Sequence, residues 1–100
     1  MDFQTARKVM VDSQVRVNDV TDRALQAALL AVPRETLCAT DRAFSAYAEV
    51  EVPVTARRSL MLPRDLSKLL MAAAPKPGER ALVMSGAYAA AVLAQMGLEV

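Results

Sequence analysis

The stretch ERALVMSGAYAAAVLAQMGLEV, residues 79–100, decides the fold class of this 100-residue chain. Its residues 81–84 are a continuous apolar run, which is typical of a buried parallel strand. Ser85 and Gly86 follow as a turn, and the alanine-rich residues 87–96 predict a helix. The order of strand, turn and helix is that of the first half of a βαβ unit.

Gly97 is a natural C-terminal cap for that helix, and residues 98–100 predict the start of a second strand. A sheet of one strand and the beginning of another cannot close a core by itself. We therefore expect the α/β unit to be incomplete in this chain, and we expect a longer natural chain or a partner to complete it. The same argument predicts that the strand edges at 81–84 and 98–100 are covered.

Upstream of this unit the sequence predicts helices. Residues 3–16 show a loose helical periodicity of apolar side chains. A second helix ends before Pro33, because proline disfavours helical geometry in the residue that precedes it. The candidates for the N-cap of this second helix are Asn18, Asp19 and Thr21. Its apolar face is predicted to consist of Leu25, Ala28, Leu29 and Val32.

An extended arm and a third helix connect these helices to the βαβ unit. Valines alternate with other residues over 50–54, which predicts a short strand, and Pro53 excludes a central position in a sheet. Pro63 begins the third helix, because proline is favoured in the first helical turn. The apolar face of this helix is predicted to consist of Leu66, Leu69, Leu70 and Ala73.

Composition excludes several classes of function. The formal net charge is +1, with acids and bases interspersed, so there is no electrostatic footprint for nucleic acid or an anionic membrane. With no histidine and one cysteine, Cys38, the chain cannot form an internal disulfide or a Ser-His or Cys-His catalytic pair. We expect no metal site, because no suitable spacing joins the four aspartates Asp12, Asp19, Asp22 and Asp41. We also expect neither a secretory signal nor a membrane span, and hence a cytoplasmic location.

Four stretches resemble, in their order and spacing, the amino-terminal region of the protein-L-isoaspartate O-methyltransferases. They are MVDSQVR (10–16), VTDRALQAALLAVPRE (20–35), AYAEVEVPV (46–54) and SLMLPRDLSKLLMAAAPKPGERALVM (59–84). The Val-Pro-Arg-Glu motif that ends a helix in that family is intact at residues 32–35. The resemblance covers the chain from about residue 10 to its last residue.

The resemblance implies a Rossmann-like fold that uses S-adenosylmethionine to methylate the free carboxylate of isoaspartyl residues. Residues 1–62 would then form a helical amino-terminal cap and a substrate-side arm. Residues 63–100 would form the first helix, strand and helix of a truncated α/β methyltransferase domain. By the same resemblance, the cofactor-binding loop corresponds to Ser85, Gly86, Ala87 and Tyr88. The substrate-side loop corresponds to Ser59, Met61 and Pro63.

Both loops depart from the family pattern. The family's cofactor loop reads approximately Asp-Val-Gly-x-Gly-x-Gly-Tyr-Ser-Ala, and its glycines let the backbone approach the cofactor where a Cβ would clash. Here Gly86 is the one glycine left in a shortened loop, and Val83 takes the acidic position. Met61 stands where many members have serine, and a thioether cannot donate a hydrogen bond. We therefore expect weak or vestigial cofactor binding and no catalytic residue in this chain.

These departures favour a catalytically degenerate family member that acts as a protein-binding or accessory subunit. Its partner would be a protein, alone or in a larger multi-subunit assembly, with no nucleic acid, no membrane insertion and no bound cofactor. The alternative is an active S-adenosylmethionine-dependent isoaspartyl carboxyl methyltransferase with a divergent cofactor loop, of which this chain is the amino-terminal part. An unrelated small helical domain is the third hypothesis.

Two further features have a structural and a functional interpretation. Arg57, Arg58 and Arg64 form either a solvated face or a site that receives an acidic substrate or partner. Cys38, between Leu37 and Ala39, is either a small buried hydrophobe or a reactive thiol.

Overall fold

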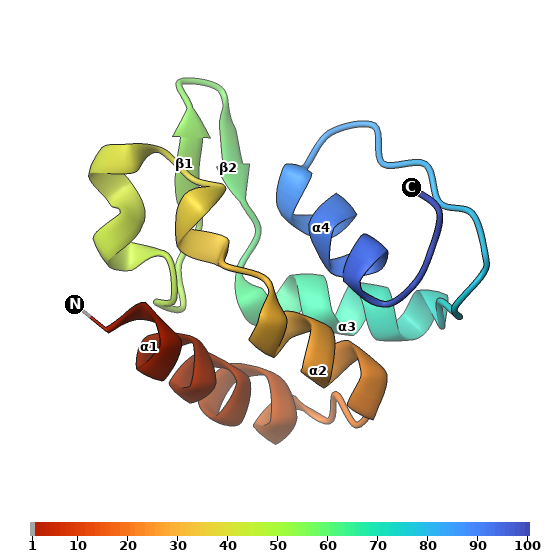
Figure 1. The fold of residues 1–100 in the computed structure, drawn as a ribbon. Helices are drawn as coiled ribbons and strands as arrows, with labels where there is room; N and C mark the ends of the chain where they lie inside the picture. Colours follow the sequence, from red (N-terminus) through yellow and green to blue (C-terminus); the bar gives the residue numbers. More distant parts are fainter. Residues whose placement is uncertain (1) are drawn as a thin grey trace.

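The computed structural model describes residues 2–100, which form an α/β arrangement of helices and one two-stranded sheet. The α-helices are α1 (Phe3–Met10), α2 (Arg23–Ala31), α3 (Pro63–Ala73) and α4 (Ala87–Gln95). The strands are β1 (Val52–Thr55) and β2 (Arg58–Leu60). A π-helical segment spans Val11–Val15, and 3₁₀ turns span Arg16–Asn18, Arg34–Thr36 and Thr40–Ser45. In Figure 1, α1, α2 and α3 lie below the hairpin β1–β2 and α4, which stand side by side above α3.

The helix predicted at residues 3–16 is confirmed and runs further. α1 continues without interruption into the π-helical segment and then into the 3₁₀ turn that ends at Asn18. Asp19 ends the run because it adopts the left-handed conformation, with φ of 65°. Because the backbone leaves helical geometry at Asp19, α2 begins as a separate helix with its own cap.

The N-cap predicted for α2 is wrong. None of the three candidates caps the helix; instead the carboxylate of Asp22 accepts a hydrogen bond from the Leu25 N–H at 3.1 Å. Asp19 ends the preceding helix, and Asp22 caps α2 because it directly precedes Arg23, the first helical residue. The predicted apolar face is confirmed, because Leu25, Ala28, Leu29 and Val32 are all buried. Pro33 follows a residue in extended conformation, as predicted.

The valine-rich arm forms an antiparallel hairpin. Val52 pairs with Leu60 and Pro53 with Ser59, with an irregularity in register between Pro53 and Thr55. The first strand agrees with the predicted extended arm, and Pro53 lies in a sheet of two strands, where a missing backbone donor is tolerated. The return strand β2 was not predicted from the sequence.

The third helix begins at Pro63 as predicted, but its buried face is different. Leu66, Ser67 and Leu70 are buried, whereas Leu69 is 57% exposed and Ala73 is also exposed. Successive residues rotate by about 100° around a helix, so the buried stripe that starts at Pro63 continues through Leu70 and leaves Leu69 on another side. The prediction that Leu69 and Ala73 belong to the buried face is therefore wrong.

The C-terminal region forms the beginning of a parallel pairing. Arg80 pairs with Glu99 in parallel, and the Ala81 N–H donates to the Glu99 carbonyl at 2.8 Å. α4 lies between these two segments in the chain, and Gly97 follows it with φ of 94°, as expected of its cap.

The buried strand predicted at residues 81–84 is not observed. Leu82 is 85% exposed and Met84 is 89% exposed, and the pairing ends at Ala81. Among residues 2–100 no other strand lies beside residues 82–84 to hold them extended. Within the same residues, every helix is too short or too polar to cross a lipid bilayer.

Candidate functional site

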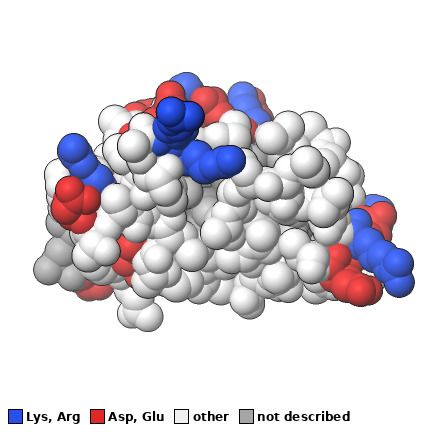
Figure 2. All heavy atoms as spheres, turned by 90° about the horizontal axis from the view of Figure 1, so that it is seen from above, with Lys and Arg blue, Asp and Glu red and all other residues white. Residues whose placement is uncertain are grey.

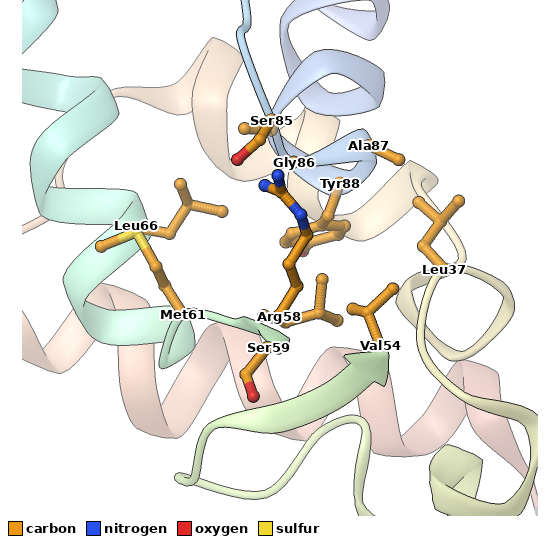
Figure 3. Close-up of a pocket in the computed structure, with 12 residues that line it drawn as sticks. Leu37, Val54, Arg58, Ser59, Met61, Leu66, Ser85, Gly86, Ala87 and Tyr88 are labelled. Atoms are coloured by element: carbon orange, nitrogen blue, oxygen red, sulfur yellow. The ribbon is translucent and has the colours of Figure 1, made fainter. Parts of the chain in front are cut away.

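A cavity of about 300 Å³ opens between the hairpin, the start of α3 and the N-terminus of α4. Figure 3 shows its lining side chains converging from these three elements. The hairpin contributes Val54 and residues 58–60, the turn into α3 contributes Met61, α3 contributes Leu66, and the opposite wall consists of residues 85–89. Leu37 closes one side. Its volume lies at the lower end of the range for small-molecule sites in proteins.

The structure places most of the predicted site residues around this one cavity. Ser85, Gly86, Ala87 and Tyr88 form one wall, and Ser59 and Met61 lie across from them. Pro63 does not line the cavity; it is buried in the first turn of α3. Two loops that are about 25 residues apart in sequence therefore face each other, while their roles in binding stay predictions.

The turn before α4 requires its glycine for backbone conformation. Gly86 has φ of 122°, which side-chain-bearing residues rarely adopt, and a Cβ added there would meet no atom within 4 Å. In this structure the glycine therefore does not serve a close approach of neighbouring protein atoms. No side chain caps the N-terminus of α4, so its first backbone N–H groups have no side-chain acceptor.

Among residues 2–100, Arg58 is the one charged residue that lines the cavity. In Figure 3 its guanidinium reaches across the cavity toward Ser85 and Gly86. Among residues 2–100, the ion pairs of the three arginines involve Arg64, with Glu49 at 3.2 Å and Asp65 at 3.4 Å, but not Arg57 or Arg58. The arginine group considered from sequence is therefore divided, and only Arg58 enters the cavity wall.

The arginine of the Val-Pro-Arg-Glu motif lies against Tyr88, a residue of the cavity wall, without lining the cavity itself. Arg34 is fully buried and donates through Nε to the Ala46 carbonyl at 2.6 Å and through Nη2 to the Met61 carbonyl at 2.7 Å. Its guanidinium carbon lies 4.8 Å from the centroid of the Tyr88 ring. Arg34 follows α2 and contacts three other parts of the chain. These are Ala46 after the 3₁₀ turn Thr40–Ser45, Met61 before α3, and Tyr88 in α4. Sequence reasoning noted the motif without this role.

Burial shifts the titration of both partners in this contact. Burial lowers the pKa of Arg34, although the neighbouring Tyr88 acts in the opposite direction. Burial also raises the pKa of the Tyr88 hydroxyl. The Arg34 Nη1 and the Tyr88 hydroxyl are buried without a hydrogen-bond partner among residues 2–100.

A second polar network fastens α1 to the same region. Arg7 donates through Nε to the Tyr47 hydroxyl at 2.9 Å and through Nη2 to Glu35 at 3.3 Å, and the Tyr47 hydroxyl donates to the same Glu35 oxygen. Burial, followed by the hydrogen bond to Glu35, raises the pKa of Tyr47 to about 12. Burial by itself would raise the pKa of Glu35. Hydrogen bonds that include those from Tyr47 and Arg7 outweigh it and lower this pKa. This network lies outside the cavity and is structural.

Among residues 2–100, the cavity wall contains no cysteine and no group of metal-ligating side chains. Cys38 is half-buried against the core, its Sγ lies 3.6 Å from the Glu35 carbonyl, and burial raises the pKa of its thiol. A raised pKa leaves the thiol less reactive, which favours the structural interpretation. Within residues 2–100, no group of three or more metal-ligating side chains comes together.

Comparison with known proteins finds relatives that carry the same name. The chain is 35% identical over 101 residues to a protein-L-isoaspartate O-methyltransferase of Methylorubrum extorquens, covering 99% of this chain and 44% of the relative. It is 35% identical over 97 residues to the protein of the same name from Methylorubrum populi, covering 95% and 46%. It is 33% identical over 93 residues to that of Gloeobacter violaceus, covering 91% and 45%. No protein-family model matches the chain. The chain spans less than half the length of these relatives.

Proposed function

Since this chain is homologous over nearly its whole length to the amino-terminal part of the protein-L-isoaspartate O-methyltransferases, we propose that it comes from a catalytically degenerate member of that family. In this proposal the protein acts as a protein-binding or accessory subunit. The parallel pairing of Arg80 with Glu99 around α4 supports a Rossmann-like beginning for residues 63–100. The cytoplasmic location and the protein partner are part of the same proposal.

The residues around the cavity do not fit S-adenosylmethionine. The cofactor carries a positively charged sulfonium, whereas the one charged group in the cavity wall is the cationic Arg58. The loop that resembles the family's cofactor loop keeps one glycine, Gly86, and has Val83 where the family has an acid. We therefore derive no methyl-transfer step through this cavity.

The observation that carries the proposal is the departure of the cofactor loop, which keeps one glycine, Gly86, and has Val83 at the acidic position. The loop geometry supports it. The residues before Gly86 turn outward, with Met84 89% exposed. A backbone that leaves the expected strand at Ala81 lacks the rigid strand end from which such a cofactor loop normally starts.

One observation favours the alternative, an active S-adenosylmethionine-dependent isoaspartyl carboxyl methyltransferase. The loops that resemble the cofactor and substrate loops of the family lie on opposite walls of one cavity, as an enzyme would need. In that case residues of the complete protein outside this chain would supply the missing carboxylate.

Calorimetric titration of the complete protein with S-adenosylmethionine, and separately with S-adenosylhomocysteine, distinguishes the two. The Methylorubrum extorquens relative, titrated under the same conditions, is the positive control. The proposal predicts no saturable heat from a protein that circular dichroism shows to be folded. Saturable binding at micromolar ligand would overturn it and favour the active enzyme. Affinity purification from the native cytoplasm, with this protein as bait, then tests for the protein partner.

A further inference from the structure

The first turns of α1 are held against the molecule by few contacts. Met10 is the buried residue of α1, and residues 3–9 are half-buried or exposed. Within them, the apolar side chains of Phe3 and Ala6 pack partly against the core. A helix this short is marginal in water by itself, so its attachment depends on what binds it to other elements. We name residues 3–9 the strap.

Arg7 fastens the strap to three other parts of the chain. Its guanidinium donates to the Tyr47 hydroxyl at 2.9 Å, to the Leu30 carbonyl at 3.1 Å and to the Glu35 carboxylate at 3.3 Å. Among residues 2–100, these are the hydrogen bonds that join the strap to residues beyond Asn18. The strap therefore depends on one side chain for its polar attachment.

The ion pair between Arg7 and Glu35 is shielded from water. Their side chains are 11% and 12% exposed, whereas in every other ion pair among residues 2–100 both side chains are at least 40% exposed. Figure 2 shows such exposed charges on one face, where they lie mainly at the margins of a largely uncharged area. Water and salt screen exposed pairs, so the shielded pair holds more strongly than the others.

From this geometry we propose that the strap is released by acid: protonation of Glu35 removes the charge that binds Arg7, and residues 3–9 detach while the rest of the domain stays folded. The helical run beyond the strap stays in place, because Met10 and Val11 are 1% exposed. This inference goes beyond the proposed function and does not depend on it, because it concerns α1 and involves no ligand of the cavity.

Glu35 is the group of this cluster that changes charge in acid. Burial, followed by the hydrogen bond to Glu35, raises the pKa of Tyr47 to about 12, so its hydroxyl is neutral. Burial also raises the pKa of the Cys38 thiol and of the Tyr88 hydroxyl, which are neutral in acid as well. The neighbouring cations are arginines, which stay protonated: Arg7 and Arg34.

The direction of the pH dependence follows from the carboxyl group of Glu35. Burial by itself would raise its pKa, but hydrogen bonds that include those from Tyr47 and Arg7 lower it below the ordinary value of 4.5. Such a carboxylate stabilises the closed strap above its ordinary pKa, and this stabilisation declines as the pH falls. The exposed charges of the adjacent 3₁₀ turn, Asp41 and Arg42, make no ion pair with Glu35 within the described residues. The strap is therefore fastened at neutral pH and opens below about pH 4.5.

Two other carboxylates belong to the same helical run and require a control. Asp2 caps α1 by accepting hydrogen bonds from Thr5, which lower the pKa of Asp2. Asp12 pairs with Lys8 and Arg16 of the same run. Neither carboxylate joins the strap to another element. Asparagine at both positions leaves a capping side chain at residue 2 and removes the two charges.

Hydrogen exchange of the complete protein, followed by mass spectrometry, measures the opening of the strap between about pH 7 and about pH 3. Exchange in the peptide that covers residues 3–9 is corrected for the intrinsic pH dependence of exchange and compared with that of α2. The variants are Glu35→Gln, Arg7→Gln and the double control Asp2→Asn with Asp12→Asn. Circular dichroism verifies that each variant is folded.

Wild type and the double control should both open the strap about 10- to 100-fold more at the acid end, as loss of a charge-assisted hydrogen bond predicts. Opening of α2 should change by less than about two-fold over the same range. Glu35→Gln and Arg7→Gln should show the acid level of opening already at about pH 7 and keep it. The inference is overturned if wild type shows no acid step, if the step persists in Glu35→Gln, vanishes in the double control or is shared by α2, or if Arg7→Gln opens no more than wild type.

Discussion

Arg34 is predicted to hold the domain together, and we expect its removal to lower the stability of the fold strongly. Arg34→Ala removes the two hydrogen bonds to the carbonyls of Ala46 and Met61 and the stacking on Tyr88. Hydrogen bonds from a charged group contribute about 1.5–3 kcal/mol each. A desolvated cation–π contact adds about 1–2 kcal/mol. Against these gains stands the cost of burying the guanidinium, which Arg34→Ala relieves.

The net loss follows from which groups are left without partners. Ala46 is buried, so its carbonyl would lose its donor in a place that water does not reach, at a cost of about 1–3 kcal/mol. Met61 is 44% exposed, so its carbonyl can turn to solvent and costs less. The two charge-assisted hydrogen bonds and the ring contact outweigh the relieved cost of burial, and we predict a loss of about 3–5 kcal/mol for Arg34→Ala.

Urea denaturation of the complete protein, followed by circular dichroism, measures this loss. Arg42→Ala is the matched control, because Arg42 is exposed and its side chain makes no hydrogen bond or ion pair among residues 2–100. It should change the free energy of unfolding by less than about 0.5 kcal/mol. Arg34→Lys should fall between the two, because an ammonium cannot reproduce the planar fork. A loss below about 1 kcal/mol in Arg34→Ala would refute the account of Arg34 as the connecting residue.

Three further changes test other parts of the structure. Gly86→Ala should cost about 1–3 kcal/mol of stability in a denaturation experiment, because a residue with a side chain is strained at φ of 122°. The added Cβ would meet no protein atom, so the cost comes from the backbone alone. An unchanged stability would show that the turn can adopt another conformation. Asp22→Ala should cost about 1 kcal/mol by loss of the α2 cap, while Thr21→Ala, a candidate that does not cap, should stay within about 0.5 kcal/mol; equal losses would contradict the observed cap. In a spectrophotometric titration, Tyr47 should ionise near pH 12, and Tyr47→Phe should remove that step. Since its folded pKa lies above the ordinary value of 10.0, its contribution to stability should be complete below pH 10 and decline toward pH 12; a titration step near pH 10 instead would contradict the hydrogen bond to Glu35.

Helices and their buried faces were largely predictable from the sequence. The 3.6-residue periodicity of Leu25, Ala28, Leu29 and Val32 is a local property, and Pro33 restricts the backbone whatever its surroundings. Leu69 shows the limit of this reasoning. Its spacing from Leu66 and Leu70 suits a shared face, but the position of that face depends on where α3 contacts its neighbours, which the sequence does not contain.

Long-range contacts could not be predicted. The apolar run at 81–84 has the composition of a buried strand, but a strand is buried only when another strand lies beside it. Whether the strand edges are covered in the complete protein stays a prediction. The Arg34 contacts likewise join positions 12 and 27 residues apart, and no spacing rule indicates them.

Part of the candidate site was predictable through the family resemblance. It indicated Ser59, Met61 and the residues 85–88, which the structure places around one cavity. Arg58 was considered only as one of three arginines, because sequence alone does not show which of them folds inward and which finds an acid on the surface. The apposition of the two loops is a product of the hairpin, whose return strand has only three residues and left no clear pattern.

Methyl transfer itself tests the central claim most directly. The complete protein would be incubated with S-adenosylmethionine labelled with tritium in its methyl group and with an isoaspartyl peptide, alongside the Methylorubrum extorquens relative. The proposed degenerate function predicts base-labile label in the peptide at the level of a protein-free blank for this protein, and well above it for the relative. Label transferred to the isoaspartyl peptide by this protein, but not to the same peptide with ordinary aspartate, would contradict the account and establish the active enzyme.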